Sequence, residues 1–179
     1  EDFVIFGVRA CDVRSFDVLD RVFLAEPVDT YYKNRREHGI IMSLACAKPE
    51  ETCFCGTFGI DPAEPAGDIA CCIAGGNLLL DARTEKGSEL LSKLDAITEN
   101  ADEAAAKQQK ELIRERMKKL PLATLDASAF GAGKTDEFFN APEWATLSQS
   151  CLGCGSCTFV CPTCQCYDIK DFNTGHGIK

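Results

Sequence analysis

The sequence predicts an α+β fold, in which an α/β-like N-terminal part with a mixed sheet is followed by a helical linker and part of a cysteine-rich module. Three patterns in the 179 residues indicate this organisation. Apolar runs alternate with helical patterns near the N-terminus, which favours parallel strands. Two later apolar runs flank Gly75-Gly76 and predict a hairpin in the same sheet. Cysteines gather near the other end of the chain.

The first elements form a βαβ-like pattern. Residues 3–9 predict a short buried strand. Asp12 is expected to cap the next helix, whose apolar side chains recur at positions i, i+3 and i+7, namely Phe16, Leu19 and Phe23. Residues 30–38 predict a polar helix and residues 40–44 a second strand.

The middle of the chain supplies the hairpin and one helix. Residues 59–68 contain proline and glycine and predict a loop. Strands are expected at 69–73 and 77–82, on either side of the glycine turn. Residues 85–97 predict a helix that turns its leucines inward.

A longer helix is predicted over residues 101–120, with Asp102 in its first turn and Pro121 directly after it. Its apolar stripe is narrow, which indicates a spacer helix rather than a core helix. The composition of the next stretch, 122–142, predicts a linker. The expected division of the chain is an α/β domain at 1–98, a helix and linker at 99–142, and the cysteine-rich module at 143–179.

The charge balance excludes some classes of partner. Lys and Arg number 19 and Asp and Glu number 28, which gives a net charge of −9. An acidic chain is a poor candidate for binding nucleic acid or anionic lipid. Since no apolar run approaches the roughly 18 residues of a transmembrane helix, we expect no membrane insertion. The sequence begins at Glu1, almost directly before its first strand, and we expect it to be a middle piece of a longer protein.

Cysteine is the outlier of the composition, at 12 of 179 residues. A disulfide scaffold is typical of short secreted chains, whereas this chain is long enough to bury a core. Zinc sites favour paired Cys or His ligands, and neither His38 nor His176 lies near a CxxC at zinc-ligand spacing. The third possibility is iron–sulfur ligation, and its spacing is present.

Residues 151–162 carry the spacing C-x2-C-x2-C-x3-C-P of bacterial ferredoxins. Two-residue spacers let one loop place three thiolates around a [4Fe-4S] cluster, and Gly153 and Gly155 allow positive φ angles in that loop. Pro162 suits the first position of a short helix opened by the fourth cysteine. The module is therefore expected to be ferredoxin-type, with Cys151, Cys154, Cys157 and Cys161 as ligands.

The run by itself leaves the ligand sets incomplete. In two-cluster ferredoxins its fourth cysteine binds the other cluster, and a second run supplies the complement. Residues 1–179 contain no second run. Either that run lies outside these residues, which is the favoured explanation, or Cys164 and Cys166 help to close a site.

Four more cysteines follow predicted strands or lie in the next loop, namely Cys11, Cys46, Cys53 and Cys55. Loops at the C-terminal edge of a parallel sheet converge, so these thiols could surround one cluster. The alternative is that Cys11 and Cys46 are small buried apolar side chains. The adjacent Cys71 and Cys72 would point to opposite faces of a strand, which indicates buried strand residues rather than ligands of one metal.

Several segments together resemble one family: Gly7-Val-Arg9-Ala-Cys11-Asp12-Val-Arg14, Arg35-Arg36-Glu37, Pro49-x-x-Thr52-Cys53-Phe54-Cys55, and the run from Cys151 to Cys161 with its continuation Pro-Thr-Cys164-x-Cys166-x-Asp168-Ile. The chain resembles the iron–sulfur beta subunit of NiFe hydrogenases and sulfhydrogenases, and the related A subunit of anaerobic sulfite reductase. The resemblance implies [4Fe-4S] clusters and assigns the four N-terminal cysteines to the family's pattern. After Cys55 the family usually continues with Met-Gly and a Gly-Pro step, whereas this chain reads Gly56-Thr57-Phe58-Gly59.

The expected function is electron transfer between a flavin/NAD(P)H or ferredoxin-linked subunit and a catalytic subunit of hydrogenase or sulfite reductase type. No acid, base or nucleophile is positioned for catalysis by the chain itself. One alternative is a zinc-stabilised protein-interaction module. Another is a reductase that uses Cys164 or Cys166 as redox thiols. We expect a cytoplasmic protein whose partners are other oxidoreductase subunits.

Overall fold

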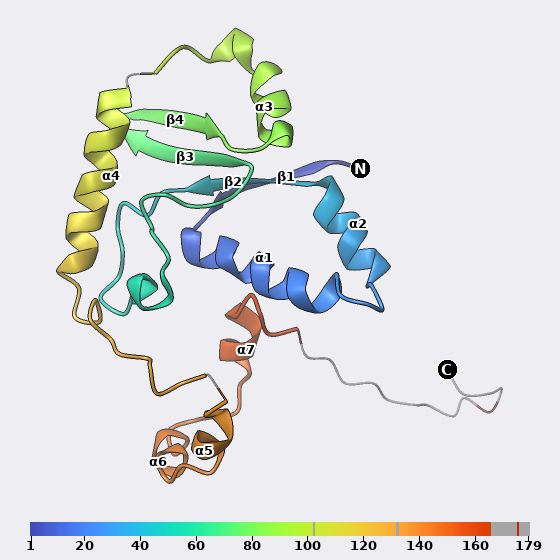
Figure 1. Cartoon of the computed structure of the whole chain (residues 1–179), viewed down its shortest axis with the longest axis vertical. Helices are drawn as coiled ribbons and strands as arrows, with labels where there is room; N and C mark the ends of the chain where they lie inside the picture. The colour runs from blue at the N-terminus through green and yellow to red at the C-terminus, as the bar shows by residue number, and fades with distance from the viewer. Residues whose placement is uncertain (102, 132, 166–174, 176–179) are drawn as a thin grey trace.

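A computed structural model describes residues 1–101, 103–131, 133–165 and 175, and a four-stranded sheet lies at its centre (Figure 1). β1 and β2 are parallel, as are β2 and β3, whereas β3 and β4 are antiparallel. The predicted α+β fold with a mixed sheet is confirmed. The strands lie in chain order as β1 (Phe3–Val8), β2 (Gly39–Leu44), β3 (Ile69–Ala74) and β4 (Asn77–Ala82).

Helices α1 (Ala10–Phe23) and α2 (Thr30–His38) connect β1 to β2. The predicted capping of α1 by Asp12 is wrong, because the helix begins earlier, with Arg9 at the cap position. Asp12 instead lies in the first turn, where its negative charge suits the helix N-terminus. α2 is capped by Asp29, whose side chain accepts a hydrogen bond of 2.9 Å from the backbone N–H of Tyr32.

The predicted hairpin is confirmed. Gly75 and Gly76 have φ angles of 59° and 85°, which a tight turn between β3 and β4 requires and which only glycine adopts without strain. Helix α3 (Glu85–Ser92) follows β4, and the Thr84 side chain caps it through a 3.2 Å hydrogen bond from the Gly87 N–H. The helix predicted over 85–97 is therefore shorter, and a separate 3₁₀ turn spans Asp95–Ile97.

The core consists of two clusters on opposite faces of the sheet, because Cys71 and Cys72 are neighbours in β3 and point to opposite sides. On one face Cys71 packs with Met42 and Ile69 beneath leucines of β4 and α3. On the other face Cys72 packs with Ala45, Ala63 and Ile113. Helices α1 and α3 lie on opposite sides of the sheet (Figure 1). The interpretation of Cys71 and Cys72 as buried strand residues is confirmed.

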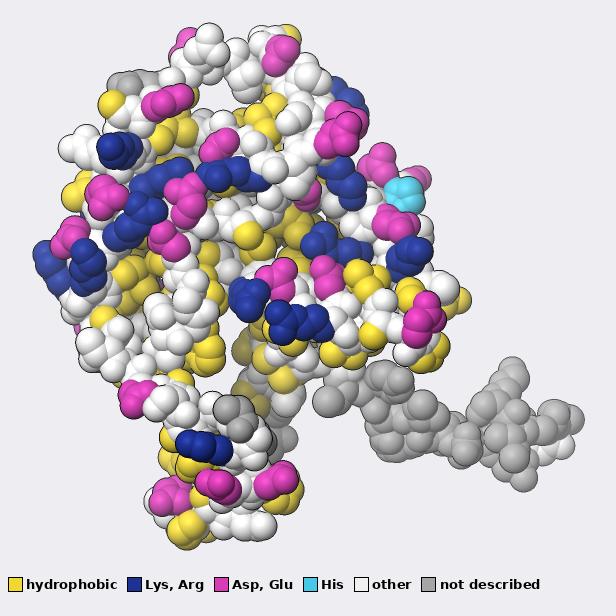
Figure 2. Space-filling view, viewed as in Figure 1, with side chains coloured by type: hydrophobic (Ala, Val, Ile, Leu, Met, Phe, Trp, Pro, Cys, Tyr) yellow, Lys and Arg dark blue, Asp and Glu magenta, His cyan; other side chains and the backbone are white. Residues whose placement is uncertain are grey.

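Helix α4 (Glu103–Lys118) is part of the core, and the prediction of a spacer helix is wrong. Ile113 is fully buried against β3. Ion pairs flank this buried side chain. Lys110 Nζ lies 2.9 Å from Glu64, and Arg114 Nη2 lies 2.8 Å from Asp61, both on the loop before β3. Figure 2 shows such basic and acidic side chains interleaved on this side of the molecule. The predicted first-turn residue Asp102 lies outside the described residues.

The C-terminal part contains three short helices: α5 (Thr135–Phe139), α6 (Glu143–Leu147) and α7 (Ser156–Val160). The stretch 122–142, predicted to be a linker, thus contains α5. None of the helices in the described ranges is long and apolar enough to cross a membrane.

Candidate metal centre

The N-terminal thiols gather where the parallel strands β1 and β2 end. Cys11 lies in the first turn of α1, directly after β1, and Cys46 lies two residues after β2. Cys53 and Cys55 lie in the next loop, where Cys55 begins a 3₁₀ turn (Cys55–Phe58). Because the two parallel strands end at the same edge of the sheet, these loops meet there.

The four thiols lie within electrostatic range of one another. Cys55 interacts with Cys11, Cys46 and Cys53, and Cys46 interacts with both Cys11 and Cys53. All but one of the possible pairs are therefore coupled, the exception being Cys11 with Cys53. The topology places these thiols at one edge of the sheet, but no three of them converge as ligands of one metal ion do, so their role as one ligand set stays a prediction.

Cys46, Cys53 and Cys55 are part-buried, whereas Cys11 is exposed. Partial desolvation of the thiol raises the pKa of Cys11 and of Cys46 above the ordinary thiol value. Burial and the three neighbouring thiols raise the pKa of Cys55 to about 11. Ligand thiolates must be deprotonated, so loading this site with metal would release protons.

Hydrogen bonds fix the backbone around Cys46 and Cys53. The Cys46 N–H donates to the Pro62 carbonyl at 2.9 Å. The Arg9 guanidinium donates to the Ala45 carbonyl at 3.1 Å, and its charge opposes the effect of burial on the pKa of Cys46. The Glu50 N–H donates to Cys53 Sγ at 3.3 Å. Amide hydrogen bonds to sulfur are among the interactions that set the potential of iron–sulfur clusters.

Helix α4 and the segment after it are hydrogen-bonded to the loops that carry Cys46 and Cys55. Arg116 donates a side-chain hydrogen bond to the carbonyl of Ala47, next to Cys46. Thr57, within the 3₁₀ turn, donates to the carbonyl of Leu125 at 3.1 Å. The loops that carry Cys46 and Cys55 are thus tied to α4 and to the segment after it.

The C-terminal run folds as a short loop and helix. Gly153 and Gly155 adopt φ angles of 66° and 72°, as predicted, and Gly155 caps α7. The predicted helix opening at the fourth cysteine is wrong: α7 ends before Cys161, and Pro162 lies in the turn after it. Proline fits there because the turn does not need its missing N–H.

The thiols of this run are exposed except for Cys161, which is half-buried. A side-chain hydrogen bond to Ser156, 3.3 Å long, lowers the pKa of Cys154. Hydrogen bonds with Thr163 and Cys164 lower the pKa of Cys161 to about 7. Cys166 and His176 lie outside the described residues, so their predicted roles stay predictions.

The donor chemistry of both groups fits iron–sulfur ligation. Each offers four thiols on glycine-containing or backbone-anchored loops, and thiolates are the ligands of [4Fe-4S] clusters. Across the described ranges, no three or more His, Cys, Asp or Glu side chains converge as they would around one metal ion.

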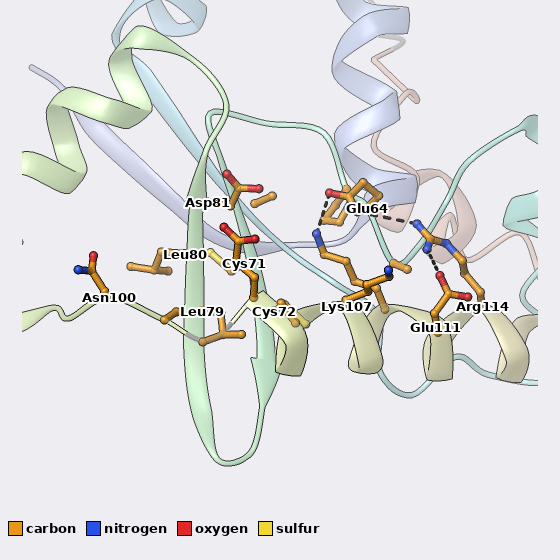
Figure 3. A pocket seen from close by; sticks show the side chains of 17 residues that line it. Glu64, Cys71, Cys72, Leu79, Leu80, Asp81, Asn100, Lys107, Glu111 and Arg114 are labelled. Atoms are coloured by element: carbon orange, nitrogen blue, oxygen red, sulfur yellow. Dashed lines mark hydrogen bonds and ion pairs between the residues drawn. The ribbon is translucent and has the colours of Figure 1, made fainter.

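A second feature, which sequence reasoning missed, is a groove of about 750 Å³ between α4 and the β3–β4 hairpin (Figure 3). Lys107 and Lys110 line it from α4, and Asp81 and Leu79 line it from β4. Glu64 accepts hydrogen bonds from Lys110 and Arg83 at its rim. The recurrence of basic residues three and four positions apart on α4 was the available signal. The narrow apolar stripe of α4 instead indicated a spacer helix.

Comparisons with known proteins agree with the cysteine pattern. Residues 150–178 match the model of the 4Fe-4S dicluster domain family. The chain is 35% identical over 169 residues, or 94% of its length, to "Sulfhydrogenase 2 subunit beta" of Pyrococcus furiosus. It spans about half the length of that relative (50%). No solved structure gives a significant match. The resemblance drawn from the sequence is thereby confirmed: the match to a 4Fe-4S dicluster domain at residues 150–178 and the similarity of nearly the whole chain to a hydrogenase beta subunit support [4Fe-4S] clusters as the cofactor.

Proposed function

We propose that the chain is an electron-transfer part of a multisubunit oxidoreductase. In this role it relays electrons between a flavin/NAD(P)H or ferredoxin-linked subunit and a catalytic subunit of hydrogenase or sulfite reductase type. The observation that carries the proposal is the ferredoxin-type run at 151–161 within the matched dicluster segment. Similarity to a sulfhydrogenase beta subunit supports the choice of complex.

The proposed ligands form two sets. One set consists of the N-terminal thiols, and the other of the thiols in the ferredoxin-type run. The first set would be complete within this chain, since its four thiols are electrostatically coupled at one edge of the sheet. The second would share a cluster pair with a further run outside residues 1–179. The sets are Cys11, Cys46, Cys53 and Cys55, and Cys151, Cys154, Cys157 and Cys161.

The proposed domains follow the same division. The α/β domain at 1–98 would carry the first set, residues 99–142 would connect it to the module, and the ferredoxin-type module at 143–179 would carry the second set. Thr57, hydrogen-bonded to Leu125 at 3.1 Å, supports a fixed connection between the first two of these.

When bound, [4Fe-4S] clusters supply one-electron oxidation and reduction. The chain's own residues hold thiolates in place, shield them from water and adjust the local charge. The Glu50 N–H at Cys53 Sγ and the Arg9 cation beside Cys46 both stabilise negative charge on sulfur. Each therefore favours the more negatively charged, reduced form and raises the reduction potential.

The lack of disulfides within the described ranges supports a cytoplasmic location, which we include in the proposal. No two cysteines there are joined by a disulfide. Reducing compartments keep thiols in this state, whereas oxidising ones favour disulfides. The partners proposed here are other oxidoreductase subunits.

Iron and acid-labile sulfide, measured on anaerobically purified chain, test the proposal. We expect about four of each per chain, held by the complete N-terminal set. Cys11→Ala should remove most of this iron, whereas Cys72→Ala should keep it, because Cys72 is buried among apolar side chains and belongs to neither set. If Cys154→Ala removes iron but Cys11→Ala does not, the proposed electron-transfer role stands and the N-terminal ligand set is overturned. Bound zinc without acid-labile sulfide would overturn the electron-transfer role and favour a structural zinc module.

A further inference from the structure

The edge strand β1 has the sequence of an interior strand. Its residues Phe3–Val8 read FVIFGV and contain no polar side chain. Parallel strands with continuous apolar runs are typical of sheet interiors, where both faces are covered and both edges paired. Among the residues that the structure describes, β1 pairs with β2 alone, so one of its edges is open there.

Both faces of β1 are also left uncovered. Phe6 is 58% exposed and Val4 is 45% exposed on one face of the sheet. On the other face Ile5 is 37% exposed and lies in an apolar groove of about 300 Å³ between β1, α1 and α2. Exposed apolar edges of this kind are sites of strand addition.

The groove has one charged group without a partner. Arg36 at its rim is engaged, because it pairs with Asp20 at 3.2 Å and stacks over the Phe16 ring at 5.5 Å. Arg35 lines the same groove and forms no ion pair with any residue that the structure describes. A carboxylate at the edge of the groove would complement it.

We propose that β1 is an interior strand in the native protein, and that a further apolar strand, parallel to β1, pairs with its open edge. This strand would carry or precede a carboxylate that reaches Arg35. It would be supplied by the same protein, from polypeptide outside residues 1–179. The length of the Pyrococcus furiosus relative supports this source, since the match covers only 50% of it. A parallel neighbour needs a crossover, usually a helix, and that helix would cover one of the exposed faces of β1.

Hydrogen exchange tests the proposal. Residues 1–179 are compared with the natural polypeptide in which this sequence occurs, both prepared anaerobically with their metal. Amides of residues 3–8 should exchange at least about tenfold more slowly in the natural polypeptide, while amides of α4, which is already packed against β3, should change little.

Two results would overturn the proposal. The first is that the amides of residues 3–8 exchange equally fast in both proteins. This result is also expected if the natural polypeptide contains no segment that covers β1. The second is protection of residues 3–8 in the isolated chain that rises with its concentration, because a second copy would then cover the edge.

A substitution gives an independent readout. Phe6→Lys should lower the melting temperature of the isolated chain by less than about 2 °C but that of the natural polypeptide by more than about 6 °C. The matched control is Leu78→Lys, at a residue of β4 that is 44% exposed. It should have the same effect in both proteins. If Phe6→Lys lowers the melting temperature equally in the two proteins, the proposal that a further strand covers β1 is contradicted.

Discussion

The Arg9 guanidinium donates a 3.1 Å hydrogen bond to the carbonyl of Ala45 and so joins the end of β1 to the end of β2. These two residues lie directly beside the loops that carry Cys11 and Cys46. The bond therefore ties together the two loops that carry Cys11 and Cys46.

Replacing Arg9 by Gln should loosen the two loops. We expect the free energy of unfolding of the metal-free chain to fall by about 1 kcal/mol, the usual contribution of such a hydrogen bond. Anaerobic urea denaturation measures it. Arg21→Gln, on the exposed side of α1, should change it by less than about 0.5 kcal/mol. Equal effects of the two substitutions would show that the Arg9 bond does not organise these loops.

Ile113 should be the most costly single truncation in α4. It is fully buried with Ala45, Ala63 and Cys72, so Ile113→Ala leaves a cavity and is expected to cost about 2–4 kcal/mol. The adjacent Leu112 is half-exposed, and Leu112→Ala should cost less than about 1 kcal/mol. Denaturant titration of both variants distinguishes a packed α4 from a spacer helix, for which the two costs would be alike.

Glu64 should make the stability of the fold depend on acid pH. Burial raises the pKa of this carboxyl, but hydrogen bonds from Lys110 and Arg83 outweigh burial and hold it below its ordinary value. Because the pKa is lower in the folded state, the charged carboxylate stabilises the fold at pH values above the pKa of the unfolded state, about 4.3. This stabilisation is lost as the pH falls through the pKa of the folded state.

The matched variant is Glu64→Gln. At pH 7 it should be less stable than the natural chain by about 1 kcal/mol or less, since the group is partly exposed. The difference should shrink as the pH drops below about 4. The comparison is the thermal unfolding of both proteins between about pH 3 and pH 7. A difference that grows toward acid pH would refute the role of Glu64.

Replacing Gly87 by alanine should destabilise the fold, which is opposite to the usual effect of this substitution in a helix. Alanine normally stabilises a helix relative to glycine by about 1 kcal/mol. A Cβ at Gly87 would collide with the backbone carbonyl oxygen of Asp68, so Gly87→Ala should destabilise the fold by more than about 2 kcal/mol. Gly56 is the control because a Cβ there meets no atom within 4 Å, and its φ is not in the left-handed region. Circular dichroism melts should show a large loss for the first variant and little change for the second.

The sheet could be predicted because its signals are local. Each strand is an apolar run, and Gly75-Gly76 supplies the positive φ angles that favoured two-residue hairpin turns use. The position of the N-terminal thiols in loops at one edge of the sheet also followed from sequence, since parallel strands bring their C-terminal loops to one edge. Their role as ligands of one cluster stays a prediction.

The failures arose where a single side chain or a distant partner decides the structure. One residue, Ile113, anchors α4, and a narrow apolar stripe cannot reveal how deeply one side chain inserts. The ion pairs of α4 join residues about fifty positions apart, so the spacing of basic residues along α4 does not by itself show what lies opposite them across the groove. The helix expected at Pro162 instead lies before Cys161, because Gly155, with its positive φ, caps it earlier.

The central claim is that this chain carries electrons on sulfur-ligated iron. Its most direct test is an EPR-monitored potentiometric titration of the anaerobically purified chain. We predict a signal that appears on reduction by dithionite, follows a one-electron Nernst curve and disappears reversibly on reoxidation. A metal-loaded chain that gives no such signal down to about −700 mV, the lower limit for iron–sulfur clusters, would contradict the account.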